Sequence, residues 1–159
     1  MSPAKTAFQD LYPEDYSHCY GCGRLNPEGQ QIKTYWEGDL SVTRFEPRPY
    51  HAAVPGVVYG GLLASLLDCH GIGTAVAAAA RAQGRSIDSE PPFRYVTAWL
   101  KVDYLKPTPM GVVLEIRGRA KAVKGRTVVV ESTLLAGGVA TVESELVAVQ
   151  MPDSFLTQP

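Results

Sequence analysis

The sequence is short of charged residues and of cysteines. Of its 159 residues only 19% are charged, and the formal net charge is −1. No broad electrostatic field therefore favours nucleic acid or a membrane surface, and we expect neither as a partner. The three cysteines, an odd number, do not make a disulfide framework, which favours a reducing, cytoplasmic location.

Long uninterrupted apolar segments are also missing. The first ten residues contain no apolar core of the kind that a signal peptide needs, so none is expected. The most apolar stretch, residues 60–82, is interrupted by Asp68, His70 and two glycines, so we predict that it is too polar to span a membrane. The length fits one domain with a sizeable core.

The chain divides into a lead segment, one domain and a short tail. In the lead, residues 1–17, a small apolar cluster that includes Phe8 and Tyr12 is predicted to form a turn of helix that packs on the body. The domain is expected over residues 18–151 and the tail over residues 152–159.

The pattern of apolar residues predicts one long helix and several strands. Residues 60–82 are apolar on nearly every side, as in a buried helix. Strands are predicted on both sides of it, over residues 31–36, 40–45, 94–105, 112–123, 127–135 and 139–151. Short glycine turns between the later strands are typical of antiparallel hairpins. We therefore predict an α+β fold in which a curved antiparallel sheet of five to six strands wraps a long central helix.

The segment that carries chemistry lies at the start of this helix. Gly60 and Gly61 open it, and their free amides can bind a carbonyl oxygen and stabilise the oxyanion that develops there. Asp68 follows in an otherwise apolar stretch. Because burial of an isolated carboxylate is costly, Asp68 needs a partner, a wet cleft or a raised pKa, each of which suits a general base or a nucleophile.

The spacing of these residues has a consequence for assembly. Gly60 and Asp68 are eight residues apart, which is about 12 Å along a helix axis. A single carbonyl cannot contact both in one chain. If both act on one substrate carbonyl, they come from different subunits, and the sequence then implies a dimer with two sites at its interface.

The run Pro-Gly-Val-Val-Tyr-Gly-Gly-Leu-Leu-Ala-Ser-Leu-Leu-Asp, residues 55–68, resembles the signature of the phenylacetic-acid-type hotdog thioesterases. Residues 96–107, which end in Tyr-Leu-Lys-Pro, resemble the family's next strand, and the resemblance covers residues 19–149. It implies a hotdog fold in which the amide of Gly60, with Gly61, polarises the thioester carbonyl. Asp68 attacks or activates water, and Thr97 helps to hold the water or the carboxylate.

The sequence departs from that family in two places. Tyr59 stands where a histidine usually precedes the glycine pair, and Ala52 or Ala53 stands where a side-chain amide usually orients water or supports the substrate carbonyl. His51 or the Tyr59 hydroxyl are the candidates to replace that amide.

Several further residues are candidates for binding CoA. Lys124 and Arg126 flank a glycine in a tight turn that presents both charges at one rim, and they are preferred over Lys106 and Lys121 for the CoA phosphates. Tyr104 resembles a family position near the pantetheine arm. CoA enters as part of the substrate, so no separate cofactor is expected.

Cys19 and Cys22 form half of a possible zinc site. Cys69 and His70 would complete it only if the fold brought them close. We favour instead a glycine-rich loop that covers the helix start, and we expect no metal. The Cys-x-x-Cys-Gly segment in it is similar to one found in some thioesterases.

These observations predict an acyl-CoA thioesterase that is a dimer or a dimer of dimers. One alternative is a hotdog hydratase or dehydratase, because residues 51–56 resemble a dehydratase loop, although the carboxylate expected soon after Pro55 and Gly56 is missing. Another is a protein that binds acyl-CoA without catalysis, which the loss of the loop amide and of the histidine favours.

Overall fold

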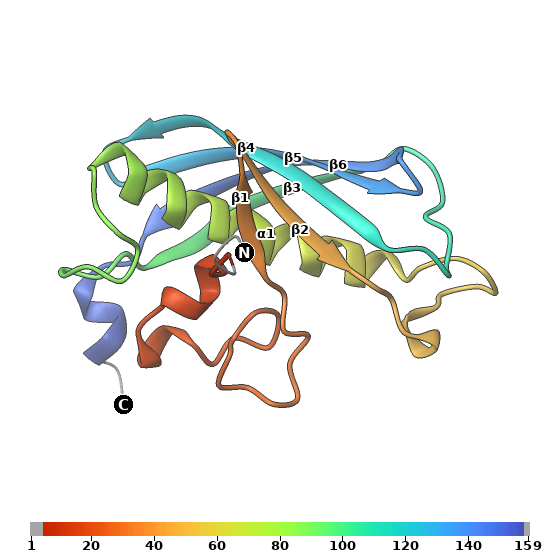
Figure 1. The fold of residues 1–159 in the computed structure, drawn as a ribbon, viewed down its shortest axis with the longest axis horizontal. Coiled ribbons are helices and arrows are strands. Elements are labelled where there is room, and N and C mark those ends of the chain that lie inside the picture. The colour runs from red at the N-terminus through yellow and green to blue at the C-terminus, as the bar shows by residue number, and fades with distance from the viewer. Residues whose placement is uncertain (1–4, 158–159) are drawn as a thin grey trace.

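The computed structural model describes residues 5–157, and in this part of the chain one long helix packs against a six-stranded sheet (Figure 1). The strands are β1 (Thr34–Glu37), β2 (Leu40–Phe45), β3 (Tyr95–Tyr104), β4 (Leu114–Lys124), β5 (Thr127–Ala136) and β6 (Val139–Gln150), and the helix is α1 (Gly60–Ala82). Four short 3-10 helices are η1 (Phe8–Leu11), η2 (Glu14–Tyr16), η3 (Pro49–His51) and η4 (Asp153–Thr157). The predicted fold class is confirmed.

The sheet is antiparallel throughout, in the order β1-β2-β4-β5-β6-β3. The hairpins predicted from glycine turns are β4–β5 and β5–β6, and Gly125 and Gly137 adopt the positive φ angles, 56° and 57°, that such turns require. Strand β3 comes directly after the helix in the chain, yet it pairs with β6 at one edge of the sheet. Its other edge has no partner within the described chain.

Only the first strand differs noticeably from its predicted bounds. It begins at Thr34 rather than at residue 31, because Gln31 has a φ of 56°, which a strand does not tolerate. The Gln31 amide instead donates to the backbone carbonyls of Gly23 and Asn26, at 2.8 and 2.7 Å. Residue 31 thus closes the loop that precedes β1.

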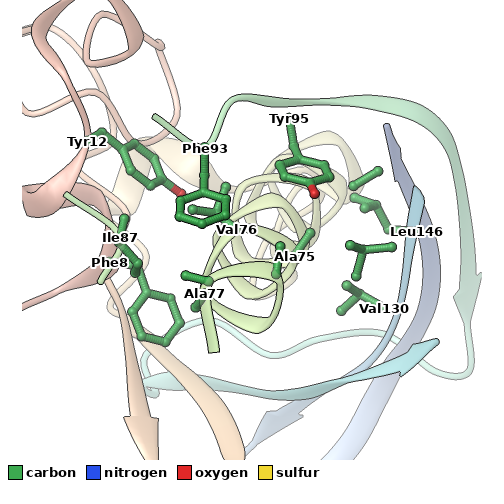
Figure 2. Close-up of a cluster of buried hydrophobic side chains, with 14 residues drawn as sticks. Phe8, Tyr12, Ala75, Val76, Ala77, Ile87, Phe93, Tyr95, Val130 and Leu146 are labelled. Carbon is green, nitrogen blue, oxygen red and sulfur yellow. The ribbon is translucent and has the colours of Figure 1, made fainter. Parts of the chain in front are cut away.

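The lead segment folds onto the helix, as predicted, in two turns of 3-10 helix. Phe8 and Tyr12, both less than 5% exposed, join a core cluster around the second half of α1. Figure 2 shows Phe8, Tyr12 and Phe93 on one side of the helix, with Val130 and Leu146 of the sheet on the other. The lead and the loop before β3 therefore cover the helix face that the sheet leaves open.

Helix α1 meets the length and composition requirements for a membrane span, the only helix within residues 5–157 to do so. The expectation that this stretch is too polar for a span therefore fails, whereas the predicted burial of the helix is confirmed. Its alanines keep the mean hydropathy of the most apolar 18-residue window at 1.5 in spite of Asp68 and His70. However, 72% of that window is buried inside the protein. This degree of burial is typical of a helix in the core of a folded domain.

A row of small residues in the sheet lies beneath His70 of the helix. Ser41, Gly118, Ser132 and Ser144 are directly paired across β2, β4, β5 and β6. A Cβ atom at Gly118 would lie 2.6 Å from His70 Nε2, so only glycine fits beneath this side chain. The row of small residues thus makes room for a ring on the underside of the helix.

His70 is the centre of a buried polar network. Its Nδ1 lies 2.8 Å from Thr43 Oγ1 and its Nε2 lies 3.2 Å from Ser41 Oγ. The network continues from Thr43 to Thr34, 2.9 Å away, and from Thr34 to the Gln9 amide in the lead segment. Burial lowers the pKa of His70 to about 3, so the ring is neutral and one nitrogen donates while the other accepts.

Replacement of Thr43 by valine should destabilise the protein. The substitution keeps the shape but leaves His70 Nδ1 and the Thr34 hydroxyl each short of a partner in a fully buried site. We expect a loss of about 1–3 kcal/mol in the free energy of unfolding, measured by urea denaturation. The matched control Thr133→Val lies on the sheet face away from the helix and should change stability by less than about 0.5 kcal/mol. Equal effects would contradict the role of the network.

Candidate active site

The carboxylate of Asp68 meets the first part of the edge strand. Thr97 Oγ1 donates a hydrogen bond to Asp68 Oδ1 at 2.5 Å, so the structure brings together two of the predicted catalytic residues. Directly after Thr97 the register of β3 against β6 shifts by one residue, a bulge at Ala98. Such bulges change the direction in which side chains point, and this one comes directly after Thr97, whose side chain points toward the helix.

Asp68 is partly withdrawn from water. Burial raises the pKa of its carboxyl group, while the hydrogen bond from Thr97 opposes that rise. A carboxylate of raised pKa is a stronger base near neutral pH than an exposed one. Asp68 and Thr97 line a cavity of about 270 Å³, whose wall also contains Tyr12, Tyr16 and Cys19.

The start of the helix offers free backbone donors. Tyr59 is the residue before the helix, and no side chain caps the helix there. Within the described chain the Gly60 and Gly61 amides have no backbone acceptor, so they are free to bind an oxygen. The Tyr59 ring folds back over Gly61, where an added Cβ would lie 2.5 Å from Tyr59 Cε1, so a larger residue here would displace this exposed ring.

Tyr104 ties this helix start to the far end of the edge strand. Its hydroxyl donates to the backbone carbonyl of Gly60 at 2.8 Å, while its side chain stays 53% exposed. Thr97 and Tyr104 are seven residues apart on β3, about 23 Å along the strand. The two halves of the predicted site, Asp68 with Thr97 and Gly60 with Tyr104, therefore lie apart within one protomer.

His51 and the two alanines that follow it lie beside Tyr59. The Tyr59 amide donates to the His51 carbonyl at 2.8 Å, and Ala52 is bridged to Val58. His51 Nδ1 accepts a hydrogen bond from the Arg48 amide at 3.0 Å, so this ring nitrogen is occupied by a local turn. Within residues 5–157 no carboxylate lies within ion-pair distance of His51.

The basic residues predicted to bind phosphate lie at the Asp68 end of the sheet. Arg126 donates to the carbonyl of Gln150, which is paired with Tyr95, two residues before Thr97. Lys124 ends β4 in the same exposed turn. Lys121, in contrast, is engaged by Glu131 and Glu145 at 3.2 and 3.1 Å on the surface of the sheet.

The loop that contains Cys19 and Cys22 lies over the middle of α1. It was predicted to cover the helix start, but Gln30 accepts a hydrogen bond from Ser65 and Gly21 lies directly against Cys69. The loop thus borders Asp68 instead. Sequence reasoning missed Tyr12 and Tyr16 as walls of the Asp68 cavity, because no local pattern signals that a 3-10 turn reaches the middle of a helix 50 residues later.

Comparisons with known proteins agree with this fold and with one another. The Thioesterase superfamily pattern matches residues 55–143, which include the helix and most of the sheet. A thioesterase superfamily protein from Shewanella loihica PV-4 is 46% identical, with a TM-score of 0.66 over 87% of this chain and 97% of that one. None of the curated proteins matches the chain.

Two more distant structures share the fold. A protein of Streptococcus mutans UA159, solved bound to acetyl-CoA, is 18% identical with a TM-score of 0.61 over 76% of this chain and 88% of that one. A hypothetical thioesterase of Streptococcus pneumoniae TIGR4, solved with coenzyme A, is 18% identical with a TM-score of 0.58 over 76% and 85%. The match over residues 55–143 and the 46% identical protein of Shewanella loihica PV-4 show that this chain belongs to the thioesterase superfamily.

Proposed function

We propose that this protein is an acyl-CoA thioesterase of the phenylacetic-acid type, which hydrolyses a thioester to a carboxylic acid and free CoA. One observation carries the proposal: the carboxylate of Asp68 is partly desolvated in an apolar helix, held by the Thr97 hydroxyl, and open to a cavity. A structural carboxylate would be expected to pair with a cation. Within the described chain Asp68 has none within 4.0 Å.

The chemistry assigned to Asp68 is one of two routes. As a general base it takes a proton from water, whose oxygen then attacks the thioester carbon; as a nucleophile its own oxygen attacks, and water cleaves the resulting anhydride. In both routes the C–S bond breaks, and CoA leaves as a thiolate that takes up a proton. Thr97 holds the carboxylate in one orientation, which restricts the direction of attack.

A symmetric dimer would join the two halves of the site. Strand β3 has ten residues, of which only Tyr95 is buried, and its outer edge has no partner within the described chain. An antiparallel pairing of β3 with its copy, with the two-fold axis near Leu100 and Lys101, would place Tyr104 of the partner subunit opposite Thr97. Because Tyr104 binds Gly60, the free helix-start amides of the partner would then face Asp68.

This arrangement supplies what each protomer lacks. The helix-start amides stabilise the negative charge that develops on the thioester oxygen, while Asp68 of the other chain delivers the nucleophile. The aromatic side chain of Trp99, 47% exposed on the same edge, would be covered in the pairing. The continuous sheet also removes an exposed strand edge, which proteins otherwise have to protect.

CoA is proposed as the carrier on the basis of the fold and the distribution of charge. Two structures with the same fold were solved with acetyl-CoA or coenzyme A. In this chain the turn with Lys124 and Arg126 lies at the end of the sheet where Asp68 and Thr97 meet, so its charges can reach the nucleotide phosphates while the thioester lies at Asp68.

The surroundings of His51 within one protomer give no support to the hydratase alternative. Such enzymes pair a histidine with a carboxylate, whereas His51 has no such partner in the described protomer and its Nδ1 is used by the Arg48 amide. The burial of His51 and the charge of Arg48 also lower its pKa, opposite to the effect of a carboxylate.

Asp68→Asn should abolish most of the activity while the protein stays folded. The substitution keeps the shape and removes both a nucleophile and a general base, so turnover of an acyl-CoA panel, measured as release of free CoA, should fall by about 100- to 10,000-fold. CoA binding, measured by calorimetry, should persist, and stability should hold or rise slightly because a desolvated charge is lost.

Asp39→Asn is the matched control for this experiment. It removes a carboxylate from the turn between β1 and β2, where Asp39 is exposed and lies 3.8 Å from Arg81, and activity should stay near that of the unmodified protein. If Asp68→Asn lowers stability but leaves turnover per folded molecule unchanged, Asp68 is structural. If no acyl-CoA is turned over by the unmodified protein while CoA binds, the chain is a binding protein.

A mixed dimer tests whether the site is shared. Gly60→Pro removes the helix-start amide at a position where proline is tolerated, since an added Cβ there would make only ordinary contacts of 3.5 Å or more with Tyr104. Chains with Gly60→Pro and Asp68→Asn should each be inactive alone. Purified as a heterodimer by two different tags, they should regain about half of normal activity, because one of two sites is intact.

The control for the mixed dimer pairs the unmodified chain with Asp68→Asn, which should also give about half activity. If each site were built from one chain, both sites of the Gly60→Pro and Asp68→Asn heterodimer would carry a defect. A folded heterodimer as inactive as its parents would therefore rule out the shared site.

Ala53→Asn tests the missing loop amide. Ala53 is exposed, and its backbone amide already donates to the Val57 carbonyl at 2.9 Å, so a longer side chain leaves the loop intact. If positioning of water or of the carbonyl limits the rate, asparagine should raise turnover by at least about tenfold. Ala53→Leu, similar in size but without a donor, serves as control. Equal rates for both variants would show that another group, such as His51, already performs this role.

A further inference from the structure

The three cysteines of the chain converge on one point. Their Sγ atoms all lie within 4.8 Å of one another, although Cys19 and Cys22 come from the loop before β1 and Cys69 from the middle of α1. The sulfurs of Cys19 and Cys69 are 3.9 Å apart. Two thiolates on one tetrahedral zinc ion, each bonded at about 2.3 Å, stand about 3.8 Å apart. The observed separation is therefore that of a zinc-thiolate pair.

The backbone is shaped to allow this convergence. Gly23 donates to the Cys19 carbonyl at 2.8 Å, which closes the turn that presents Cys19 and Cys22 on one side. At Gly21 an added Cβ would lie 2.2 Å from Cys69 Sγ, so only glycine lets the turn lie directly on the helix cysteine. A Cβ at Gly23 would meet the Cys19 backbone at 2.4 Å. Both glycines thus allow the loop with Cys19 and Cys22 to lie close to Cys69.

We propose that Cys19, Cys22 and Cys69 bind a zinc ion that fastens the loop of residues 18–32 to helix α1 beside Asp68. The two-residue spacing of Cys19 and Cys22 is that of zinc-binding turns, and thiolates select zinc over harder metals. His70, the other ligand considered from the sequence, is excluded because both of its ring nitrogens are engaged beneath the helix by Thr43 and Ser41.

The surroundings favour a ligand at this point. All three cysteines line the 270 Å³ cavity together with His18 and Asp68, so solvent has access to the fourth position of the metal. The hydroxyl of Tyr12, a residue 4% exposed in the same wall, has no hydrogen-bond partner within the described chain. Buried hydroxyls without partners are rare, and this one lies in the wall of the cavity that the three cysteines line.

A disulfide is the competing explanation for cysteines in contact. A disulfide would join two of the three sulfurs and leave the third without a role, whereas a metal uses all three. The number of converging sulfurs therefore favours the ion. The site is independent of whether the chain hydrolyses thioesters, since no catalytic step passes through the metal.

The proposal is tested on untagged protein kept reduced with a phosphine, stripped with a chelator and then titrated with Zn²⁺ or Co²⁺. We expect about one zinc ion per chain by elemental analysis after removal of free metal. Co²⁺ should give thiolate-to-metal charge-transfer bands and the intense visible bands of tetrahedral coordination. Zinc should raise the melting temperature by several degrees, because it binds only the folded chain tightly.

Variants identify the ligands. Cys19→Ser, at an exposed loop position, and Cys69→Ser should each weaken zinc binding at least about a hundredfold and remove the rise in melting temperature. The control Tyr20→Phe changes a residue between the two loop cysteines that is 64% exposed, and should bind as the unmodified chain does.

Two results would overturn the site. One is a zinc content far below one per chain in the reduced, folded protein. The other is cobalt charge-transfer absorption that persists in Cys19→Ser, whose fold circular dichroism can verify even if Cys69→Ser fails to fold. Loss of metal binding with turnover retained, or the reverse, separates this proposal from that of thioester hydrolysis.

Discussion

The burial of one helix on all of its sides is the constraint on which the rest of the structure depends. A flat sheet covers one face of a helix, so α1 needs a curved sheet, the lead segment and two loops to exclude water from it. In the middle of the sheet, His70 lies over Gly118 in a row of small residues. The polar network around His70 fixes both the rotation of the helix and the docking of Gln9, and so it sets which helix face Asp68 occupies.

Given that rotation, the position of Asp68 follows. His70 and Asp68 are two residues apart, about 200° around the helix, so a ring that points to the centre of the sheet directs the carboxylate away from it. That direction leads to the edge strand β3, to its bulge at Ala98 and to Thr97. The carboxylate is thus half-buried between the core and the open edge, where it is desolvated enough to be basic and still accessible to substrate.

Much of this architecture could be predicted from local patterns. Alternation, glycine turns and the apolar run of residues 60–82 determine β2, α1 and the four later strands within a few residues, and an aspartate in an apolar helix identifies Asp68. The convergence of Cys69 on the loop cysteines could not be predicted, since it depends on where a loop without regular structure crosses the helix. The contact of Tyr12 with the same cavity has the same origin.

Strand β3 connects assembly to chemistry. Its first half holds Asp68 through Thr97, and its second half holds the helix start through Tyr104 and Gly60. Two-fold pairing about its centre would bring the first half of one strand against the second half of the other, so a residue that stabilises pairing would also set the distance between nucleophile and oxyanion donors. On the cavity side, the three cysteines lie in the wall beside Asp68. Changes at the edge of β3 should therefore alter the geometry of the proposed thioester site, whereas changes at the cysteines should alter the cavity wall within each chain.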